Sequence, residues 1–330
     1  AIDLGTANTV IIHKGRIVLN QPSIIAIDAK TNKVLAVGKQ AELMFGKTHD
    51  SIKIVRPLRD GVIADFYVAE QMLGAMIQSV LKRSKILPLN LRIVICVPSG
   101  CTEVELRAVR DSAEHTGGRE IYIIQEPMAA ALGAGLNVQA AEGNMIVDIG
   151  GGTSEIAVIS LGGLVVNKSI RIAGDEFTND IQNYLLQKYD MKVGAVTAEK
   201  IKIAVGCASK DLKDAPGEYL VQGASRHSFL PMSVNLSSNE IVDALDRNIQ
   251  EIERAMKSAL EMTPPEIYVD IMKNGIWLAG GGALLRGLAE RFTRSLGIKC
   301  NVAENPLMSV VNGAGKALKD LKNMPFLAIN

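Results

Sequence analysis

Two stretches of this chain, far apart in sequence, repeat one pattern. Residues 2–19 read IDLGTANTVIIHKGRIVL, and residues 147–166 read VDIGGGTSEIAVISLGGLVV. Each predicts an apolar strand carrying an Asp, a glycine-containing turn, a second strand, a tight turn and a third strand. We therefore expect a duplicated fold, with one such hairpin unit in each half.

The chain between and after these stretches alternates helices with strands. Apolar residues at helical spacing predict a helix over 65–83, and a strand follows at 93–97. Thr102 and Glu105 predict a capping box at the start of a helix that ends at Gly117. Late in the chain, a strand at 276–279 precedes three glycines and a predicted helix over 283–296. This alternation predicts an α/β fold with largely parallel sheets, and 330 residues favour two lobes over one.

Composition excludes several classes of protein. The 36 basic and 35 acidic residues leave a net charge of +1, which argues against a nucleic-acid partner. The four cysteines form no CxxC pair, so we expect neither zinc nor disulfides, and a reducing, cytoplasmic compartment fits. No apolar stretch reaches the roughly 18 residues that cross a bilayer. The chain opens in a predicted strand without an initiator Met, so we expect residues upstream.

The two glycine turns suit a polyphosphate. Backbone N–H groups can approach phosphate closely where there is no Cβ, and Thr and Asn add hydrogen bonds. Asp3 and Asp148, on the strands that lead into the turns, would together hold Mg²⁺, through its waters. The candidate phosphate-binding residues are Gly5, Thr6, Ala7, Asn8 and Thr9 in the first turn and Gly150, Gly151, Gly152 and Thr153 in the second.

The third glycine run, at 280–282, is weaker on its own. It would open a helix whose N-terminal amides meet a nucleotide. It is no GxGxxG fingerprint, because position 285 is Leu, and the chain contains no GxxxxGK[ST]. A Rossmann dehydrogenase and a P-loop ATPase are both disfavoured.

These motifs, in this order, resemble those of the actin, Hsp70 and sugar-kinase superfamily. The strings that carry the resemblance are 3–9, EPMAAA at 126–131, 148–154 and 279–285. Further strings make the chain similar to the MreB family in particular: RPLRDGVIAD at 56–65, VPSG at 97–100, NMIVD at 144–148, SIRIAGDE at 169–176 and TAEKIK at 197–202. Together they cover nearly the whole chain.

The resemblance implies an ATPase and a role for each matching residue. Asp3 and Asp148 would lie around Mg²⁺, with the first two glycine turns around the β- and γ-phosphates of ATP or ADP. Glu126 would position or deprotonate the attacking water, and Thr153 would help to hold it. Residues that would meet the ribose, base or adenosine are Glu199, Lys202, Gly280, Gly281, Gly282 and Ala283. Without the resemblance, Glu126 would pass for a helix N-terminal carboxylate and Glu199 with Lys202 for a surface ion pair.

The resemblance also implies an architecture. We expect an actin-like fold of two lobes, each with an RNase H-like core and a smaller inserted subdomain, and nucleotide between them. Residues 1–140 with 313–330 would form lobe I, with its small subdomain at about 25–64. Residues 141–312 would form lobe II, with its small subdomain at about 176–243.

Partners follow from the same resemblance. Subunits would stack head to tail into protofilaments that pair antiparallel, and scaffold proteins of shape control would bind them. A basic and apolar segment would hold the filaments on the inner face of the cell membrane, against anionic lipid. Its residues are Lys82, Arg83, Lys85, Ile86, Leu87 and Leu89. The alternative is that Ile86 and Leu89 pack inward.

Three rival functions stay open on sequence. A sugar or acetate kinase of the same superfold would need an acceptor pocket, for which no signature is visible. An Hsp70-like foldase would need about two hundred further residues for its peptide-binding domain and lid. A filament protein that binds nucleotide but has lost hydrolysis is kept open by Gln125, where the family usually carries a second Glu.

Overall fold

The two repeated stretches form matching three-stranded units in two separate sheets of this computed structural model, which describes residues 1–59, 61–84, 91–210, 212–324 and 326–329. The N-terminal sheet has the strand order β19-β10-β9-β1-β2-β3, and the C-terminal sheet has the order β13-β12-β11-β17-β18. In both, the repeated unit is an antiparallel meander beside a parallel pair. The duplication expected from the sequence is confirmed.

The strands of the N-terminal sheet are β1 (Ile2–Leu4), β2 (Asn8–His13), β3 (Arg16–Pro22), β9 (Leu91–Val97), β10 (Gly118–Gln125) and β19 (Ala328–Ile329). Those of the C-terminal sheet are β11 (Asn144–Ile149), β12 (Ser154–Ser160), β13 (Gly163–Ile170), β17 (Ile276–Ala279) and β18 (Cys300–Val302). Only β1–β9, β9–β10, β11–β17 and β17–β18 pair in parallel within these two sheets as described. The expectation of largely parallel sheets is therefore wrong: the sheets are mixed, because the two meanders contribute antiparallel pairs.

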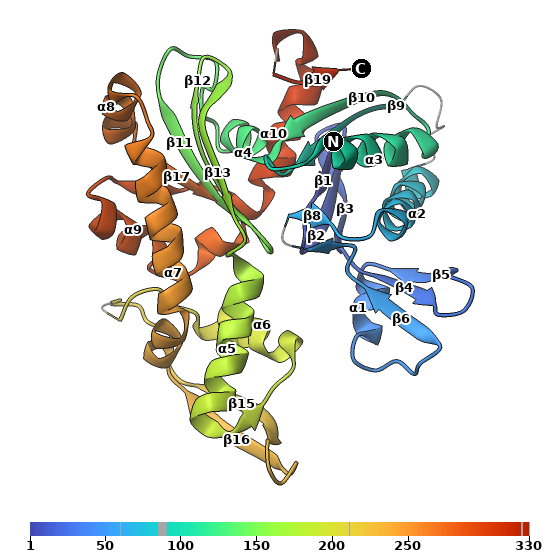
Figure 1. Cartoon of the computed structure of the whole chain (residues 1–330), viewed down its shortest axis with the longest axis vertical. Coiled ribbons are helices and arrows are strands. Elements are labelled where there is room, and N and C mark those ends of the chain that lie inside the picture. Colours follow the sequence, from blue (N-terminus) through green and yellow to red (C-terminus); the bar gives the residue numbers. More distant parts are fainter. Residues whose placement is uncertain (60, 85–90, 211, 325, 330) are drawn as a thin grey trace.

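Three smaller sheets complete the strands. They are β5-β4-β6, β14-β15-β16 and β7-β8, made of β4 (Ile25–Asp28), β5 (Val34–Val37), β6 (Ile52–Val55), β7 (Leu58–Arg59), β8 (Val62–Ile63), β14 (Met191–Lys192), β15 (Tyr219–Ser225) and β16 (Pro231–Leu236). The β4–β6 sheet extends from the half of the molecule built on the N-terminal sheet, and the β14–β16 sheet extends from the other half (Figure 1).

The helices are α1 (Lys39–Met44), α2 (Phe66–Ser84), α3 (Glu103–His115), α4 (Glu126–Gly133), α5 (Gly174–Tyr189), α6 (Ala195–Val205), α7 (Ser238–Glu261), α8 (Pro265–Asn274), α9 (Leu288–Leu296) and α10 (Ser309–Lys319). Local sequence explains several of them. Val68, Met72, Met76 and Val80 lie buried along one face of α2. The capping box at α3 is confirmed: Thr102 N donates to Glu105 Oε2 at 2.7 Å, and Glu105 N donates to Thr102 Oγ1 at 3.3 Å.

Two helices lie between the large sheets (Figure 1). A buried cluster joins Val94 of β9 and Ile146 of β11 to Ala130 of α4 and Ala314 of α10. The backbones of the two helices touch, since a Cβ on Gly313 would lie 1.8 Å from the Ala129 carbonyl oxygen. The two halves therefore meet in this buried cluster, and α4 carries Glu126 at its first residue.

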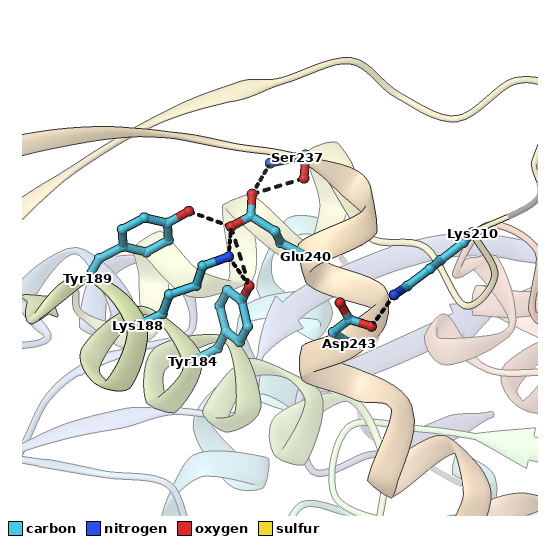
Figure 2. Close-up of polar contacts among 7 residues, drawn as sticks. All are labelled: Tyr184, Lys188, Tyr189, Lys210, Ser237, Glu240 and Asp243. Carbon is cyan, nitrogen blue, oxygen red and sulfur yellow. Dashed lines mark hydrogen bonds and ion pairs between the residues drawn. The ribbon is translucent and has the colours of Figure 1, made fainter.

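A polar cluster fixes α7 against α5 (Figure 2). Glu240 Oε1 accepts hydrogen bonds from Lys188 Nζ at 2.7 Å, from Tyr184 at 3.3 Å and from the Tyr189 hydroxyl. Its Oε2 accepts from the Ser237 amide and hydroxyl, both at 2.9 Å. Burial alone would raise the pKa of Glu240, but these hydrogen bonds outweigh it and hold the pKa at about 2. The carboxylate is fully supplied with donors.

Candidate functional site

The two glycine turns meet where the halves of the molecule meet. In the first, the Ser23 hydroxyl donates to the Gly5 carbonyl at 2.6 Å, and the Ser23 amide donates to the Ala7 carbonyl at 2.9 Å. A Cβ on Gly151 of the second turn would lie 2.8 Å from Ala7 Cβ, so only glycine permits this approach. The structure brings the two predicted phosphate turns together.

The first residues of α5 donate backbone hydrogen bonds to the second turn. The Gly174 amide donates to the Gly150 carbonyl at 3.1 Å, and the Asp175 amide donates to the Gly151 carbonyl at 2.8 Å. Within the turn, the Gly150 amide donates to the Thr153 carbonyl at 2.9 Å. Sequence reasoning assigned no role to Ser23, Gly174 or Asp175. No local pattern marks Ser23, and Gly174 with Asp175 lies in the string at 169–176.

Three acidic side chains converge on these turns. Burial raises the pKa of Asp3 to about 7. Burial, with the nearby charges of Asp3 and Glu155, raises that of Asp148 to about 8. The pKa of Glu126 lies well above its usual range because of burial and then of Asp3, Asp148 and Glu155. In the absence of a cation, the raised pKa values show that ionisation of these three carboxyl groups is disfavoured.

One atom of this cluster lacks a partner. Asp148 Oδ1 is buried, and the part of the chain that the structure describes offers it no hydrogen bond. A buried acceptor of this kind normally costs about 1–3 kcal/mol. The same described residues contain no group of three His, Cys, Asp or Glu side chains placed to hold an ion directly. Two aspartates that reach Mg²⁺ through its waters fit both observations.

Glu126 lies at the start of α4, buried, with its neighbour Gln125 exposed. A carboxylate that serves only the helix dipole has its charged form stabilised, which lowers its pKa. Here the pKa of Glu126 is raised instead, so the simple dipole role explains it poorly.

Gly61, just before β8, lies against Thr153. It has φ +71°, and a Cβ there would lie 2.6 Å from Thr153 Cγ2. Thr153 itself is buried, so a segment from the N-terminal half closes over it. Sequence reasoning gave Gly61 no role, although it lies within the string at 56–65.

The third glycine run packs against the end of β11. Gly280 has φ +78°, and a Cβ there would lie 2.3 Å from the Ile149 carbonyl oxygen and 2.5 Å from Asp148 Oδ1. The predicted helix over 283–296 is wrong in its first part. Gly281–Leu284, which includes Ala283, forms a 3₁₀ turn, and α9 begins only at Leu288 because Gly287 has φ +77°. No α-helix N-terminus therefore lies at 280–282.

Glu199 and Lys202 form an ion pair of 2.6 Å on α6. Lys202 Nζ also donates to the Gly174 carbonyl at 2.7 Å, and the Thr178 hydroxyl donates to Glu199 at 2.6 Å. Lys202 is 15% exposed at its side chain, so the pair is more than a solvated surface contact. It ties α6 to the start of α5, directly behind the second glycine turn.

The predicted membrane segment lies largely outside the described residues. This applies to Lys85, Ile86, Leu87 and Leu89, whereas Lys82 is exposed near the end of α2 and Arg83 belongs to its last turn. Among the described residues, no helix combines the length and apolar character needed to cross a bilayer.

Comparisons with known proteins agree with this geometry. A family model described as MreB/Mbl protein matches residues 1–325. The cell shape-determining protein MreB of Escherichia coli K12 is 48% identical over 324 residues, 97% of this chain and 92% of the relative. The cell shape-determining protein Mbl of Bacillus subtilis is 44% identical over 325 residues, 98% and 96% of the two chains.

Solved structures show the same fold. MreB5 of Spiroplasma citri, bound to ADP, superposes with a TM-score of 0.90 at 38% identity, covering 97% of this chain and 96% of that one. MreB5 bound to AMPPNP matches equally well. A MamK double helical filament superposes with a TM-score of 0.79 at 19% identity over 96% and 97% of the chains, which supports the fold alone. The fold is actin-like, as expected, and the chain belongs to the MreB/Mbl family.

Proposed function

We propose that this chain is an ATP-binding and ATP-hydrolysing cytoskeletal subunit that polymerises into filaments and takes part in determining cell shape. The observation that carries the proposal is the acid cluster between two glycine turns, in which Asp148 Oδ1 is buried and has no partner among the described residues. A magnesium nucleotide supplies what this arrangement lacks: positive charge beside the aspartates and phosphate oxygens for the turn amides. MreB5, a 38% identical protein of the same fold, has been solved with ADP and with AMPPNP.

We assign the residues as follows. Asp3 and Asp148 would hold Mg²⁺ through its waters, and the ion would supply positive charge against the charge that develops on the phosphates. The first two glycine turns cradle the β- and γ-phosphates, Glu199 and Lys202 face the ribose or base, and residues 280–283 lie against the adenosine.

Glu126 acts on the water, with Thr153 helping to hold it. Burial, followed by the charges of Asp3, Asp148 and Glu155, raises the pKa of Glu126 and so disfavours its ionised form in the nucleotide-free chain. A cation beside Asp3 and Asp148 would remove two of the causes of that shift, although burial, the largest cause, would remain. Loading of the site would therefore favour the ionised form of Glu126, which can accept a proton.

We expect filament formation because the chain belongs to this family. Subunits that stack head to tail contact one another through two different surfaces, and contacts of this kind propagate without closing. The lobe boundaries expected from the sequence, at residues 140–141 and 312–313, belong to the same proposal. The β4–β6 and β14–β16 sheets would then be the small subdomains that nucleotide draws together.

Sedimentation tests the proposal as a whole. The chain is spun with Mg-ATP, with Mg-ADP and without nucleotide, and phosphate release is followed in the same tubes. Filaments in the pellet together with phosphate support it. Filaments without phosphate point to a polymer that has lost its chemistry, and phosphate from a soluble species points to a kinase or regulatory ATPase.

We also propose that the segment at 82–89 holds filaments on an anionic membrane face, in the cytoplasm. Basic residues near such a surface contribute about 1 kcal/mol each. Co-sedimentation with vesicles containing anionic lipid tests this, using Ile86→Asp and Leu87→Asp together and Leu161→Asp, at an exposed apolar position in the β12–β13 turn, as a matched control. Binding that survives the paired change would refute the membrane role.

A further inference from the structure

A further acid, the buried Glu155, lies beside the site and has no part in the chemistry proposed above. It is 1% exposed and stands on β12, directly opposite Asp148 of β11. Residues directly opposite in an antiparallel pair project to the same face of the sheet. Glu155 therefore shares its face with Asp148, and it follows the second glycine turn by two residues.

The two oxygens of Glu155 are bonded by hydroxyl groups from different halves of the molecule. Ser169 Oγ, on the neighbouring strand β13, donates to Oε1 at 2.6 Å. Ser99 Oγ, in the turn that follows β9 of the N-terminal sheet, donates to Oε2. One carboxylate thus links the strand after the second glycine turn to the opposite half.

The contact differs in kind from the other junction between the halves. At α4 and α10 the backbones touch, with a Cβ on Gly133 placed 1.8 Å from the Ser309 carbonyl oxygen, so little separation is possible there. The Ser99–Glu155 contact is made by side chains and can open. A rotation of the halves about the α4–α10 contact would therefore lengthen or break the Ser99–Glu155 hydrogen bond.

We propose that Glu155 is a positioning residue that couples closure of the two halves to the geometry of the second glycine turn. When the halves are closed, both oxygens have donors and β12 is held in place. When they open, Ser99 withdraws and a buried carboxylate loses a donor, which disfavours the open arrangement by about 10- to 100-fold. Its effect on hydrolysis rests on the proposed function, whereas its effect on closure does not.

Ser99→Ala and Ser169→Ala form a matched pair, because each removes one hydroxyl from the same carboxylate but only the first crosses between the halves. The distance between the halves is measured by spin labels on Leu43→Cys and Leu220→Cys, both exposed, in a Cys101→Ser background. The labelled full-length chain is diluted into unlabelled chain, without nucleotide, so that only distances within one molecule are read.

Ser99→Ala is expected to broaden and lengthen the distance distribution, Ser99→Thr to restore it, and Ser169→Ala to leave it as in the parent. Equal broadening by both alanine variants, or by neither, would overturn the proposal, since Glu155 would then serve only its own sheet. With Mg-ATP, Ser99→Ala should also slow phosphate release about tenfold. A parent chain that releases no phosphate defeats the proposed function, while the distance comparison still decides this inference.

Discussion

Two clusters of acidic residues in this molecule differ in how far their carboxylates are supplied with hydrogen-bond donors. Glu240 receives hydrogen bonds from Ser237, Lys188 and two tyrosines, and its pKa falls to about 2. Asp148 lies in the same half of the molecule, yet its Oδ1 has no partner among the described residues and its pKa rises to about 8. In the first cluster, the chain itself supplies hydrogen-bond donors to both carboxylate oxygens of Glu240.

The second cluster contains an acceptor that the described residues leave without a donor. A protein tolerates an unsatisfied buried acid where the missing partner arrives with a ligand. The contrast therefore separates a structural polar cluster from the proposed binding site, even though both are built on carboxylates.

The largest effect should come from replacing Glu126, the acid nearest the proposed chemistry. Glu126→Gln keeps the shape but removes the base, so phosphate release should fall about 10²- to 10⁴-fold while nucleotide still binds. Glu240→Gln is the control, because it makes the same chemical change in the complete cluster and should keep the parent rate per folded molecule. Parent-like turnover in Glu126→Gln would remove the catalytic assignment.

Acid-to-amide changes should shift stability in opposite directions in the two clusters. Asp148→Asn relieves a disfavoured charge and should raise the free energy of unfolding of the magnesium-free chain by about 1–3 kcal/mol. Glu240→Gln removes the negative charge beside the Lys188 ammonium and replaces one accepting oxygen with an NH₂ group, so it should lower the free energy of unfolding by a similar amount. Urea unfolding of both variants in EDTA at pH 8 measures this. Shifts of the same sign would show that the clusters do not differ as described.

The pH dependence of stability should separate the clusters as well. The pKa of Asp3 rises from 3.8 to about 7 and that of Asp148 from 3.8 to about 8, so their contribution is complete below pH 3.8 and is lost as pH rises toward 8. The pKa of Glu240 falls from 4.5 to about 2, so its contribution is complete above pH 4.5 and is lost as pH falls toward 2.

Melting temperatures measured in EDTA from pH 3 to 9 should therefore decline on both sides of an intermediate maximum. Asp148→Asn should flatten the alkaline decline and Glu240→Gln the acidic one. An alkaline decline that Asp148→Asn leaves unchanged would place its origin outside the site.

The smallest effect should come from Lys188, the exposed partner of Glu240. Lys188→Met removes one of several donors to Glu240, and Ser237 and two tyrosines remain. The expected loss of stability is small, as for other exposed ion pairs. Thermal unfolding at low and high salt checks it, and a loss as large as that of Glu240→Gln would mean that the cluster depends on this one cation.

Much of the site was predictable because its signals are local in sequence. The two strand–turn–strand patterns predicted both glycine turns, and the spacing of Thr102 and Glu105 predicted the capping box that the structure contains. The spacing of Glu199 and Lys202 placed them on one helical face, where they form an ion pair.

What escaped prediction depends on contacts between distant segments. Three such contacts form only when the chain has folded: Ser23 with the first turn, Gly61 with Thr153, and Ser99 with Glu155. The helix predicted over 283–296 failed for a different reason. The 3₁₀ turn already ends at Leu285, whose backbone is extended, and Gly287, with φ +77°, is the residue before α9. Glycine itself costs a helix only a modest amount, so its presence did not reveal the break.

Under the proposed function, a magnesium nucleotide completes the acid cluster. The melting temperature of the parent chain at pH 8 tests it in four conditions: EDTA alone, Mg²⁺ alone, ATP with EDTA, and Mg²⁺ with ATP. We expect the combination to raise the melting temperature by more than the sum of the separate additions, because cation and phosphate complete one site. Additive shifts, or no shift with Mg²⁺ and ATP together, would contradict this account of the site.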